Sequence, residues 1–171
     1  MDKKLAQKLI AKTREDYNKV AAHFSSSRYA FNWPRVIGAI KNLEIKSGSR
    51  VLDLGCGNGR AVNLLKSFNI DYVGLDISEE LTKIAQKKYP KDEFIVSNLL
   101  DTPFSDNKFD YVISLATLHH IPSEEQRLNA LKEINRILKP NGTVLITVWY
   151  FWGDAEFKKL ILEKSITTDD L

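Results

Sequence analysis

The spacing of apolar residues along the chain changes near residue 50. Before it, apolar positions recur at helical intervals, which predicts a long helix from about Lys3 to His23 and a short one through Val36, Ile37 and Ile40. The polar stretch SSSRYAFNWP predicts a break between these two helices. After residue 50, short β-branched runs alternate with amphipathic stretches, a pattern typical of strands that alternate with helices.

The second region predicts five strands and three helices. The expected strands are Arg50–Leu54, Tyr72–Leu75, Glu93–Val96, Tyr111–Leu115 and Thr143–Trp149, and the expected helices are about Arg60–Ser67, Glu79–Tyr89 and Glu124–Leu138. This order predicts an α/β fold, a Rossmann-like, doubly wound, mostly parallel sheet of about five strands with helices on both faces. The sequence LKPNG, residues 138–142, predicts the end of the last helix and a turn into the last strand, because proline cannot continue a helix.

Composition indicates a soluble protein. At 171 residues, with 43% hydrophobic and 27% charged residues, the chain fits one domain. No apolar run approaches the roughly 20 residues of a membrane span, and the N-terminus MDKKLAQKLIAKTRED is too charged for a signal peptide. The single cysteine, Cys56, excludes an internal disulfide and thiolate-rich zinc sites, which suits the cytoplasm. We expect a helical leader over residues 1–49, a ligand-binding core over 50–150, and a C-terminal helix and tail over 151–171.

Charge is distributed unevenly. Residues 1–50 carry eleven Lys and Arg against four Asp and Glu, a balance of +7, whereas residues 51–171 carry fourteen against eighteen, a balance of −4. A basic leader on an acidic body is consistent with an anionic partner such as nucleic acid. The simpler explanation, a solvated helix face, remains open for Lys3, Lys4, Lys8 and Lys12.

The stretch VLDLGCGNGR, residues 51–60, places a glycine loop after the first strand, where a doubly wound sheet binds its ligand. Its GxGxG spacing departs from the dinucleotide fingerprint GxGxxG, and Asp53 would set a negative charge near a pyrophosphate. S-adenosylmethionine fits better than NAD, because it has a sulfonium and an ammonium group and no phosphate. The second strand ends at Asp76, 17 residues after Gly59 (76 − 59), where a carboxylate can accept the ribose hydroxyls.

Four blocks in order, VLDLGCGNGR, VGLDIS, NKFDYVIS and LKPNGTVLI, resemble the class I S-adenosylmethionine-dependent methyltransferases. In that family the sheet usually has seven strands, so the last two are expected to be missing here. The resemblance implies a cofactor site made by Gly55, Cys56 and Gly57 through their backbone, Asp53 behind the loop, Asp76 at the ribose, Ile77, Asn98 and Leu99 at the adenine, and the backbone of Leu115. Asn98 replaces the usual aspartate, and its amide oxygen is expected to accept from the adenine amino group.

The flanking segments YNKVAAHFSSSRYAFNWPRV and SLATLHHIPSEEQRLNALKEINRILKPNGTVLITVW resemble the wobble-uridine tRNA methyltransferases. That family methylates the carboxylate of 5-carboxymethyluridine, which implies tRNA as the partner. A small activating protein partner remains open, and no contact with a membrane or DNA is expected. Two alternatives also remain: a methyltransferase of a small molecule such as a quinone or lipid precursor, and a non-catalytic module that binds S-adenosylmethionine.

Residues 17–35 are expected to form a lid over this site. Arg28 is a candidate for holding the carboxylate of the cofactor or of the acceptor, and Tyr17 can add a hydroxyl to the cofactor carboxylate. Trp33 can stack on a base or cover the cofactor, or it is a core aromatic before Pro34. Of the paired histidines, His119 is the candidate for positioning the acceptor, and the other packs or caps the next helix. No metal is expected, because sequence neighbours seldom converge on one ion.

Overall fold

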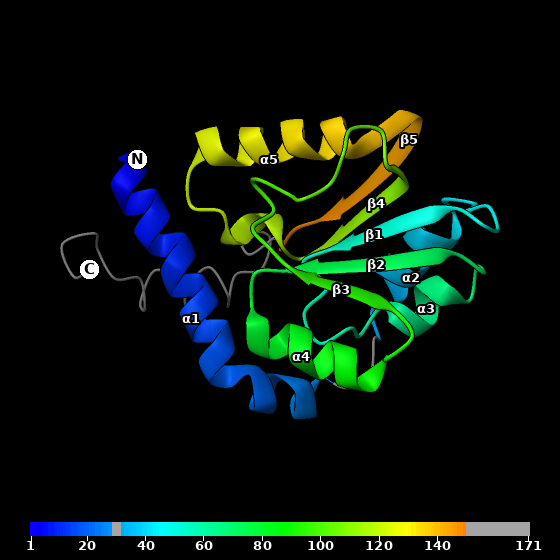
Figure 1. Ribbon diagram of the computed structural model, residues 1–171, viewed down its shortest axis with the longest axis horizontal. Coiled ribbons are helices and arrows are strands. Elements are labelled where there is room, and N and C mark those ends of the chain that lie inside the picture. Colours follow the sequence, from blue (N-terminus) through cyan, green and yellow to red (C-terminus); the bar gives the residue numbers. More distant parts are fainter. Residues whose placement is uncertain (29–31, 150–171) are drawn as a thin grey trace.

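The computed structural model describes residues 1–28 and 32–149. Within them the core is a five-stranded sheet in the order β3-β2-β1-β4-β5, and every neighbouring pair is parallel. The strands are β1 Arg50–Leu54, β2 Asp71–Asp76, β3 Glu93–Val96, β4 Phe109–Leu115 and β5 Leu138–Thr147. This arrangement confirms the predicted α/β, Rossmann-like sheet (Figure 1).

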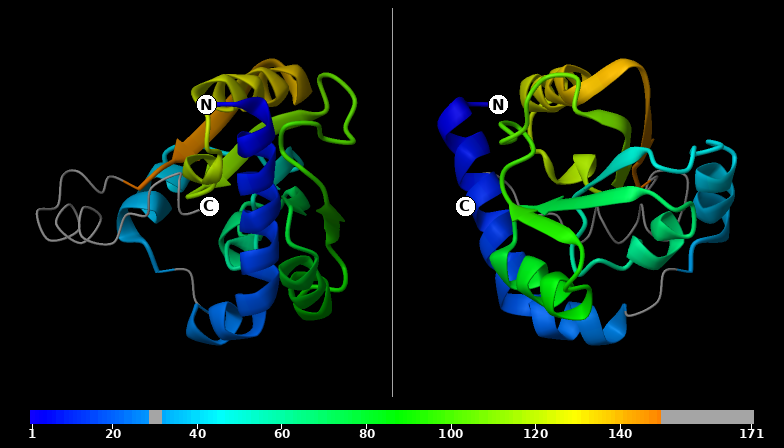
Figure 2. Two further views of the ribbon diagram at one scale, coloured as in Figure 1. Left: turned by 90° about the vertical axis from the view of Figure 1, so that its left-hand side faces the viewer. Right: turned by 45° about the vertical axis from the view of Figure 1, so that its right-hand side comes forward.

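Helices cover both faces of the sheet and one of its ends. They are α1 Lys3–Ser27, α2 Pro34–Lys41, α3 Val62–Lys66, α4 Glu79–Lys88 and α5 Glu124–Ile137, with a 3₁₀ helix η1 at Leu118–His120. Figures 1 and 2 show α5 on one face and α2, α3 and α4 on the other, with α1 crossing the end of the sheet. In the described ranges, no helix combines the length and the apolar character that crossing a bilayer requires.

Two apolar layers form because side chains alternate between the faces of each strand. On one side Leu52 and Leu54 pack with Ile134 of α5, and on the other Val51 packs with Ile40 of α2 and Leu65 of α3. All six side chains are buried. Side chains on both faces of the central strand β1 are therefore buried, as expected for a parallel sheet that is covered on both faces.

The first helix is longer than predicted. It runs to Ser27, four residues beyond the predicted end at His23, so the three serines do not break it. The hydroxyls of Ser26 and Ser27 donate to the carbonyl oxygen of His23 at 3.0 Å and 2.8 Å. Serine side chains can satisfy their hydrogen bonds against the preceding turn in this way, which makes them compatible with a helix end.

The segment LKPNG also differs from the prediction. The helix does end at Ile137, but β5 begins at Leu138, five residues earlier than predicted, and Leu138 pairs with Phe109 of β4. The extra residues are taken up by a register shift, in which Asn141 adopts a φ of 65°. The expected turn is therefore an irregularity within the strand. The helix expected over residues 151–171 lies outside the described residues.

We expect truncation of Phe109 to destabilise the fold strongly. Its side chain is fully buried, and its ring packs edge-on against Phe104 with centroids 4.8 Å apart. Phe109→Ala should lower the free energy of unfolding by about 3–5 kcal/mol, measured by urea denaturation. Leu128→Ala, at a residue that is 52% exposed, is the control and should change it by less than about 0.5 kcal/mol. Equal losses in the two variants would contradict the assigned core.

Candidate functional site

A pocket lies between α1 and the carboxyl ends of the strands. It encloses about 1070 Å³ of space free of atoms, a part of which is open to solvent. Its lining comprises Ile10, Thr13, Tyr17, Phe24, Arg28, Gly55, Cys56, Gly57, Arg60, Leu75, Asp76, Ile77, Leu81, Ser97, Asn98, Leu99, Leu115, Ala116, Thr117, His120, Ile121 and Trp149. Most of the predicted site residues are therefore brought together here. Trp33, Asp53 and His119 are not among the lining residues.

The glycine loop needs its glycines for two different reasons. Gly55 has a φ of 83°, and a Cβ atom there would overlap the side chain of Thr117. Gly57 also has a positive φ, of 54°, but its nearest neighbours would be Leu81 and Phe24 at 3.9 Å and 4.0 Å, both of which line the pocket. The close approach of a ligand to the backbone is therefore possible at Gly57, whereas Gly55 is required by packing.

Cys56 lies between these glycines and is buried. Burial raises the pKa of its thiol well above the ordinary value, so the group stays protonated. Its role in the loop is that of a small packing residue.

Asp76 holds the glycine loop in place. Its Oδ2 atom accepts a hydrogen bond from the Gly57 N–H at 2.8 Å, and its Oδ1 atom accepts one from the Ser78 N–H, also at 2.8 Å. Burial raises the pKa of this carboxyl group, while these two hydrogen bonds oppose that effect. Each carboxylate oxygen has a second lone pair, so Asp76 can still accept hydroxyl groups of a ligand in the pocket.

Asp53 lies beneath the loop and not in the pocket. It is 2% exposed, and its Oδ2 atom accepts a hydrogen bond from the Tyr72 hydroxyl at 2.9 Å. Burial raises the pKa of the carboxyl group to about 7, because the charged form is poorly solvated there. The residue can support the loop from behind, but within the described structure it has no position from which to touch a ligand.

The two adjacent histidines differ in position. The Tyr17 hydroxyl is hydrogen-bonded to Nε2 of His120 at 2.9 Å, and both residues line the pocket. The ring of His119 instead lies beside Trp149, with centroids 6.3 Å apart. Burial, with a contribution from His120, lowers the pKa of His119 to about 4. A 3₁₀ helix turns about 120° per residue, so only one of two neighbouring side chains faces the pocket.

Burial likewise lowers the pKa of His120. Both histidines are therefore neutral at physiological pH. No group of three or more potential metal-ligating residues occurs among the residues that the structure describes.

Arginine and tryptophan side chains gather near the end of α1. The guanidinium carbon of Arg28 lies 4.8 Å from the centroid of the Phe24 ring. Trp33 packs against the core cluster that contains Ile40 and meets Trp149 edge-on, with centroids 6.3 Å apart. Trp33 thus occupies the core position that was one of its two expected roles.

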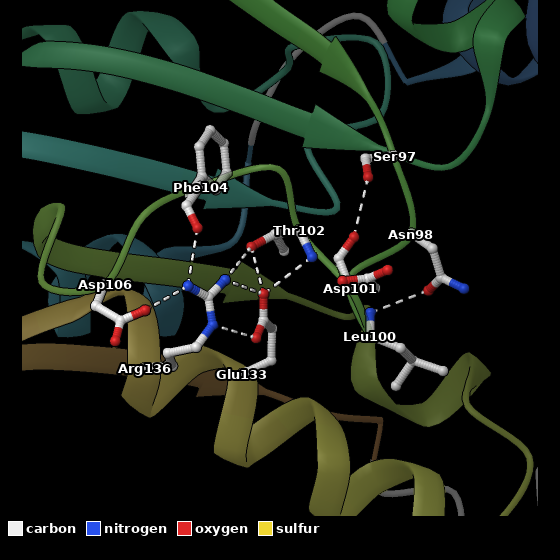
Figure 3. A network of polar contacts seen from close by, with 9 residues as sticks. All are labelled: Ser97, Asn98, Leu100, Asp101, Thr102, Phe104, Asp106, Glu133 and Arg136. Atoms are coloured by element: carbon white, nitrogen blue, oxygen red, sulfur yellow. Dashed lines mark hydrogen bonds and ion pairs between the residues drawn. The ribbon is translucent and has the colours of Figure 1, made fainter.

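The loop after β3 is fixed by a polar network (Figure 3). Oδ1 of Asn98 accepts from the Leu100 N–H at 3.0 Å, which leaves its second lone pair for a ligand. Glu133 of α5 accepts from the Thr102 N–H at 2.9 Å, and hydrogen bonds from Arg136 lower the pKa of Glu133 to about 2. These bonds hold the loop against α5 and thereby keep Asn98 and Leu99 in the pocket wall.

Several lining residues were missed by sequence reasoning. They include Phe24, Arg60, Thr117, His120 and Trp149. Arg60 had a signal, because it directly follows the glycine loop. The others depend on how α1 and η1 pack over the strand ends, which local sequence does not reveal.

Known proteins resemble this chain in sequence and in structure. The family described as a methyltransferase domain matches residues 52–146. A tRNA (carboxymethyluridine(34)-5-O)-methyltransferase of Arabidopsis thaliana is 42% identical over 133 residues, which cover 78% of this chain and 31% of that protein. The chain therefore spans less than a third of the length of this relative.

Two solved structures show the same fold. One chain of the complex between the Haloferax volcanii Trm112 methyltransferase activator and a methyltransferase has a TM-score of 0.72 and 28% identity, covering 86% of this chain and 66% of its own. Haemonchus contortus phosphoethanolamine N-methyltransferase 2 in complex with S-adenosyl-L-methionine has a TM-score of 0.64 and 26% identity. The match covers 81% of this chain and 35% of that protein.

We expect Asp53→Asn to remove a pH-dependent loss of stability. The folded-state pKa of about 7 lies above the ordinary value of 3.8, so the protonated form favours folding at low pH. The stabilisation of the folded state by the raised pKa of Asp53 is fully present below about pH 4 and is lost as the pH rises through about 7. Asparagine mimics the neutral form at every pH. The free energy of unfolding of the variant, relative to wild type, should therefore increase between about pH 5 and pH 8, measured by urea denaturation.

The exposed Asp101 provides the control substitution, Asp101→Asn. Parallel stability profiles for wild type and Asp53→Asn across this pH range would contradict the burial of an ionisable carboxyl group beneath the loop.

Proposed function

The chain belongs to the methyltransferase-domain family, and on that premise we propose that it transfers the methyl group of S-adenosylmethionine to a carboxylate on a modified wobble uridine of tRNA. The observation that carries this proposal is the pocket at the strand ends, where Gly57, Asp76 and Arg28 meet. Its acceptor is inferred from the 42% identity to the Arabidopsis thaliana tRNA (carboxymethyluridine(34)-5-O)-methyltransferase.

The lining of the pocket fits the cofactor. The open backbone at Gly57 leaves room for the methionine part, and Asp76 has free lone pairs for the ribose hydroxyls. Ile77 and Leu99 offer apolar surface to the adenine. Oδ1 of Asn98 accepts from the Leu100 N–H and keeps a second lone pair, so we assign it to accept from the adenine amino group.

S-adenosylmethionine supplies the electrophilic methyl group on its sulfonium. A carboxylate acceptor is already ionised at neutral pH, so the chain needs to position it and does not need to remove a proton. Arg28 supplies a planar pair of donors that suits a carboxylate, and its side chain has no hydrogen bond or ion pair within the described residues. His120, which lines the pocket, replaces His119 as the histidine proposed to contact the acceptor.

The outer face of α1 supports a polynucleotide acceptor. Ala6, Ile10, Thr13 and Tyr17 face the sheet side, whereas four of the five exposed lysines of this helix follow a different stripe. These lysines are Lys4, Lys8, Lys12 and Lys19. A row of cations on the helix that covers the pocket is suited to contact phosphates beside the reacting nucleotide.

We extend the proposal to a small protein partner, because a similar chain occurs in the complex with the Trm112 activator.

The proposal is tested by incubating the chain with labelled S-adenosylmethionine and bulk tRNA, with and without a Trm112-type activator, followed by nucleoside analysis. A labelled methyl ester of 5-carboxymethyluridine is expected. Label found only in small molecules of a cell extract would favour the alternative acceptor class. Cofactor binding without transfer to either pool would favour a non-catalytic module.

Replacement of Asp76 should weaken cofactor binding. Asp76→Ala removes a charged acceptor for the ribose hydroxyls and the bond that holds Gly57, so affinity for S-adenosylhomocysteine should fall by about 1.5–3 kcal/mol. Calorimetry measures this, and NAD should give no binding signal. Asp71→Ala, at the exposed opposite end of β2, is the control. Tight binding of NAD, or an unchanged dissociation constant in folded Asp76→Ala, would contradict the assignment.

Arg28→Gln should reduce methyl transfer to tRNA by about tenfold or more, which corresponds to about 1.4 kcal/mol. The amide cannot neutralise the acceptor carboxylate. Lysine should restore little activity, because it lacks the planar fork of arginine. Arg35→Gln removes an exposed arginine of α2 that does not line the pocket, and this control should keep wild-type rates. Wild-type turnover by Arg28→Gln would remove this residue from the proposed site.

A further inference from the structure

A second guanidinium group lines the same pocket and had no assigned role. Arg60 follows the glycine loop, and its guanidinium carbon lies 4.2 Å from the centroid of the Trp33 ring and 6.0 Å from that of Phe24. Stacking on Trp33 fixes the plane of the group. Within the described residues the side chain forms no hydrogen bond and no ion pair, so its five donors remain available to a ligand.

The surroundings of Arg60 favour an anion. Burial lowers the pKa of this side chain, because its charge is poorly solvated there. The charge of Asp53 partly opposes this effect, and the nearby Arg28 lowers the pKa further. Within the described residues, neither Asp53 nor Asp76 forms an ion pair with Arg60. Asp53 lies under the loop against Tyr72, and Asp76 is bonded to backbone N–H groups. A partly buried cation without a paired anion is costly, and an anionic ligand would relieve that cost.

Arg28 and Arg60 approach the same aromatic ring. Their guanidinium carbons lie 4.8 Å and 6.0 Å from the centroid of Phe24. Both guanidinium groups line the pocket, and Arg28 lowers the pKa of Arg60, so anionic groups of a ligand would stabilise both. Methyl transfer to a carboxylate supplies two such groups, alongside the sulfonium and the ammonium group of the cofactor. One is at the amino-acid end of the cofactor, a three-carbon chain from the sulfur, and the other is the acceptor.

We propose that Arg60 binds the carboxylate of the methionine part of the cofactor, and that Arg28 is thereby left for the carboxylate of the acceptor. This inference rests on the proposed function. The assignment follows from position: Arg60 is half-buried, adjoins the loop that carries Gly57, and is held by Trp33. Arg28 is exposed at the end of α1, on the side from which a macromolecular acceptor can arrive.

Two ligands separate a carboxylate contact from a general effect on the pocket. S-adenosylhomocysteine carries the amino-acid end, and 5′-methylthioadenosine has the same nucleoside without it. Calorimetry with the full chain should show that Arg60→Gln weakens S-adenosylhomocysteine by about tenfold or more and leaves methylthioadenosine within about twofold. Arg60→Lys should recover only part of the loss, because a compact ammonium neither stacks on Trp33 nor binds in a bidentate manner.

Arg28→Gln is the matched control and should keep the affinity for both ligands. Equal losses of both ligands in Arg60→Gln would assign the residue to loop structure and overturn the inference. A selective loss of S-adenosylhomocysteine in Arg28→Gln, with no loss in Arg60→Gln, would reverse the assignment. Unchanged binding of both ligands in Arg60→Gln would reject this inference and leave the proposed function intact. If the wild-type chain binds neither ligand, the proposed function fails, and the inference fails with it.

Discussion

The carboxylate of Asp76 links two segments that are separate in the sequence. It accepts hydrogen bonds from the N–H groups of Gly57, after β1, and of Ser78, at the start of α4. Both strands must end at the same level for one side chain to span these groups, and the parallel register of Leu54 with Leu75 provides this. The conformation of the glycine loop, the beginning of α4 and the floor of the pocket therefore depend on one carboxyl group. Substitutions that disturb the pairing of β1 with β2 would change the geometry of the pocket before that of the rest of the fold.

The helix α1 closes the pocket from outside the sheet. Asn18 of this helix accepts from the Ser78 hydroxyl at 2.7 Å, and Tyr17 meets His120 on the opposite side. These polar contacts bridge α1 to α4 and to η1, while its apolar residues pack between them. Since Arg28 stands at the end of the same helix, the position of α1 also sets where this guanidinium points. The leader is thus part of the site in a structural sense, although it lies outside the alternating core.

The sequence predicted those features that follow from local pattern. The strands Arg50–Leu54 and Glu93–Val96 have their predicted bounds, because β-branched runs between turn residues leave little choice. Two predicted features were wrong. The serines continue α1 instead of breaking it, and the turn expected near Asn141 is an irregularity within β5. The sequence could not separate His119 from His120, because this depends on the twist of a 3₁₀ turn. The partners of Arg60 come from α1 and from Trp33, distant in sequence, and only the packed structure brings them together.

The edge-on pair of Trp33 and Trp149 has an optical consequence. These indoles lie at the junction of the leader and the end of β5, and one of them is stacked by the charged group of Arg60. Indole emission depends on the polarity and charge of its surroundings. A ligand that draws Arg60 away from Trp33, or excludes water from Trp149, would change the intrinsic fluorescence of the chain. The molecule therefore carries its own reporter at the wall of the pocket, and titrations can be followed without any attached dye.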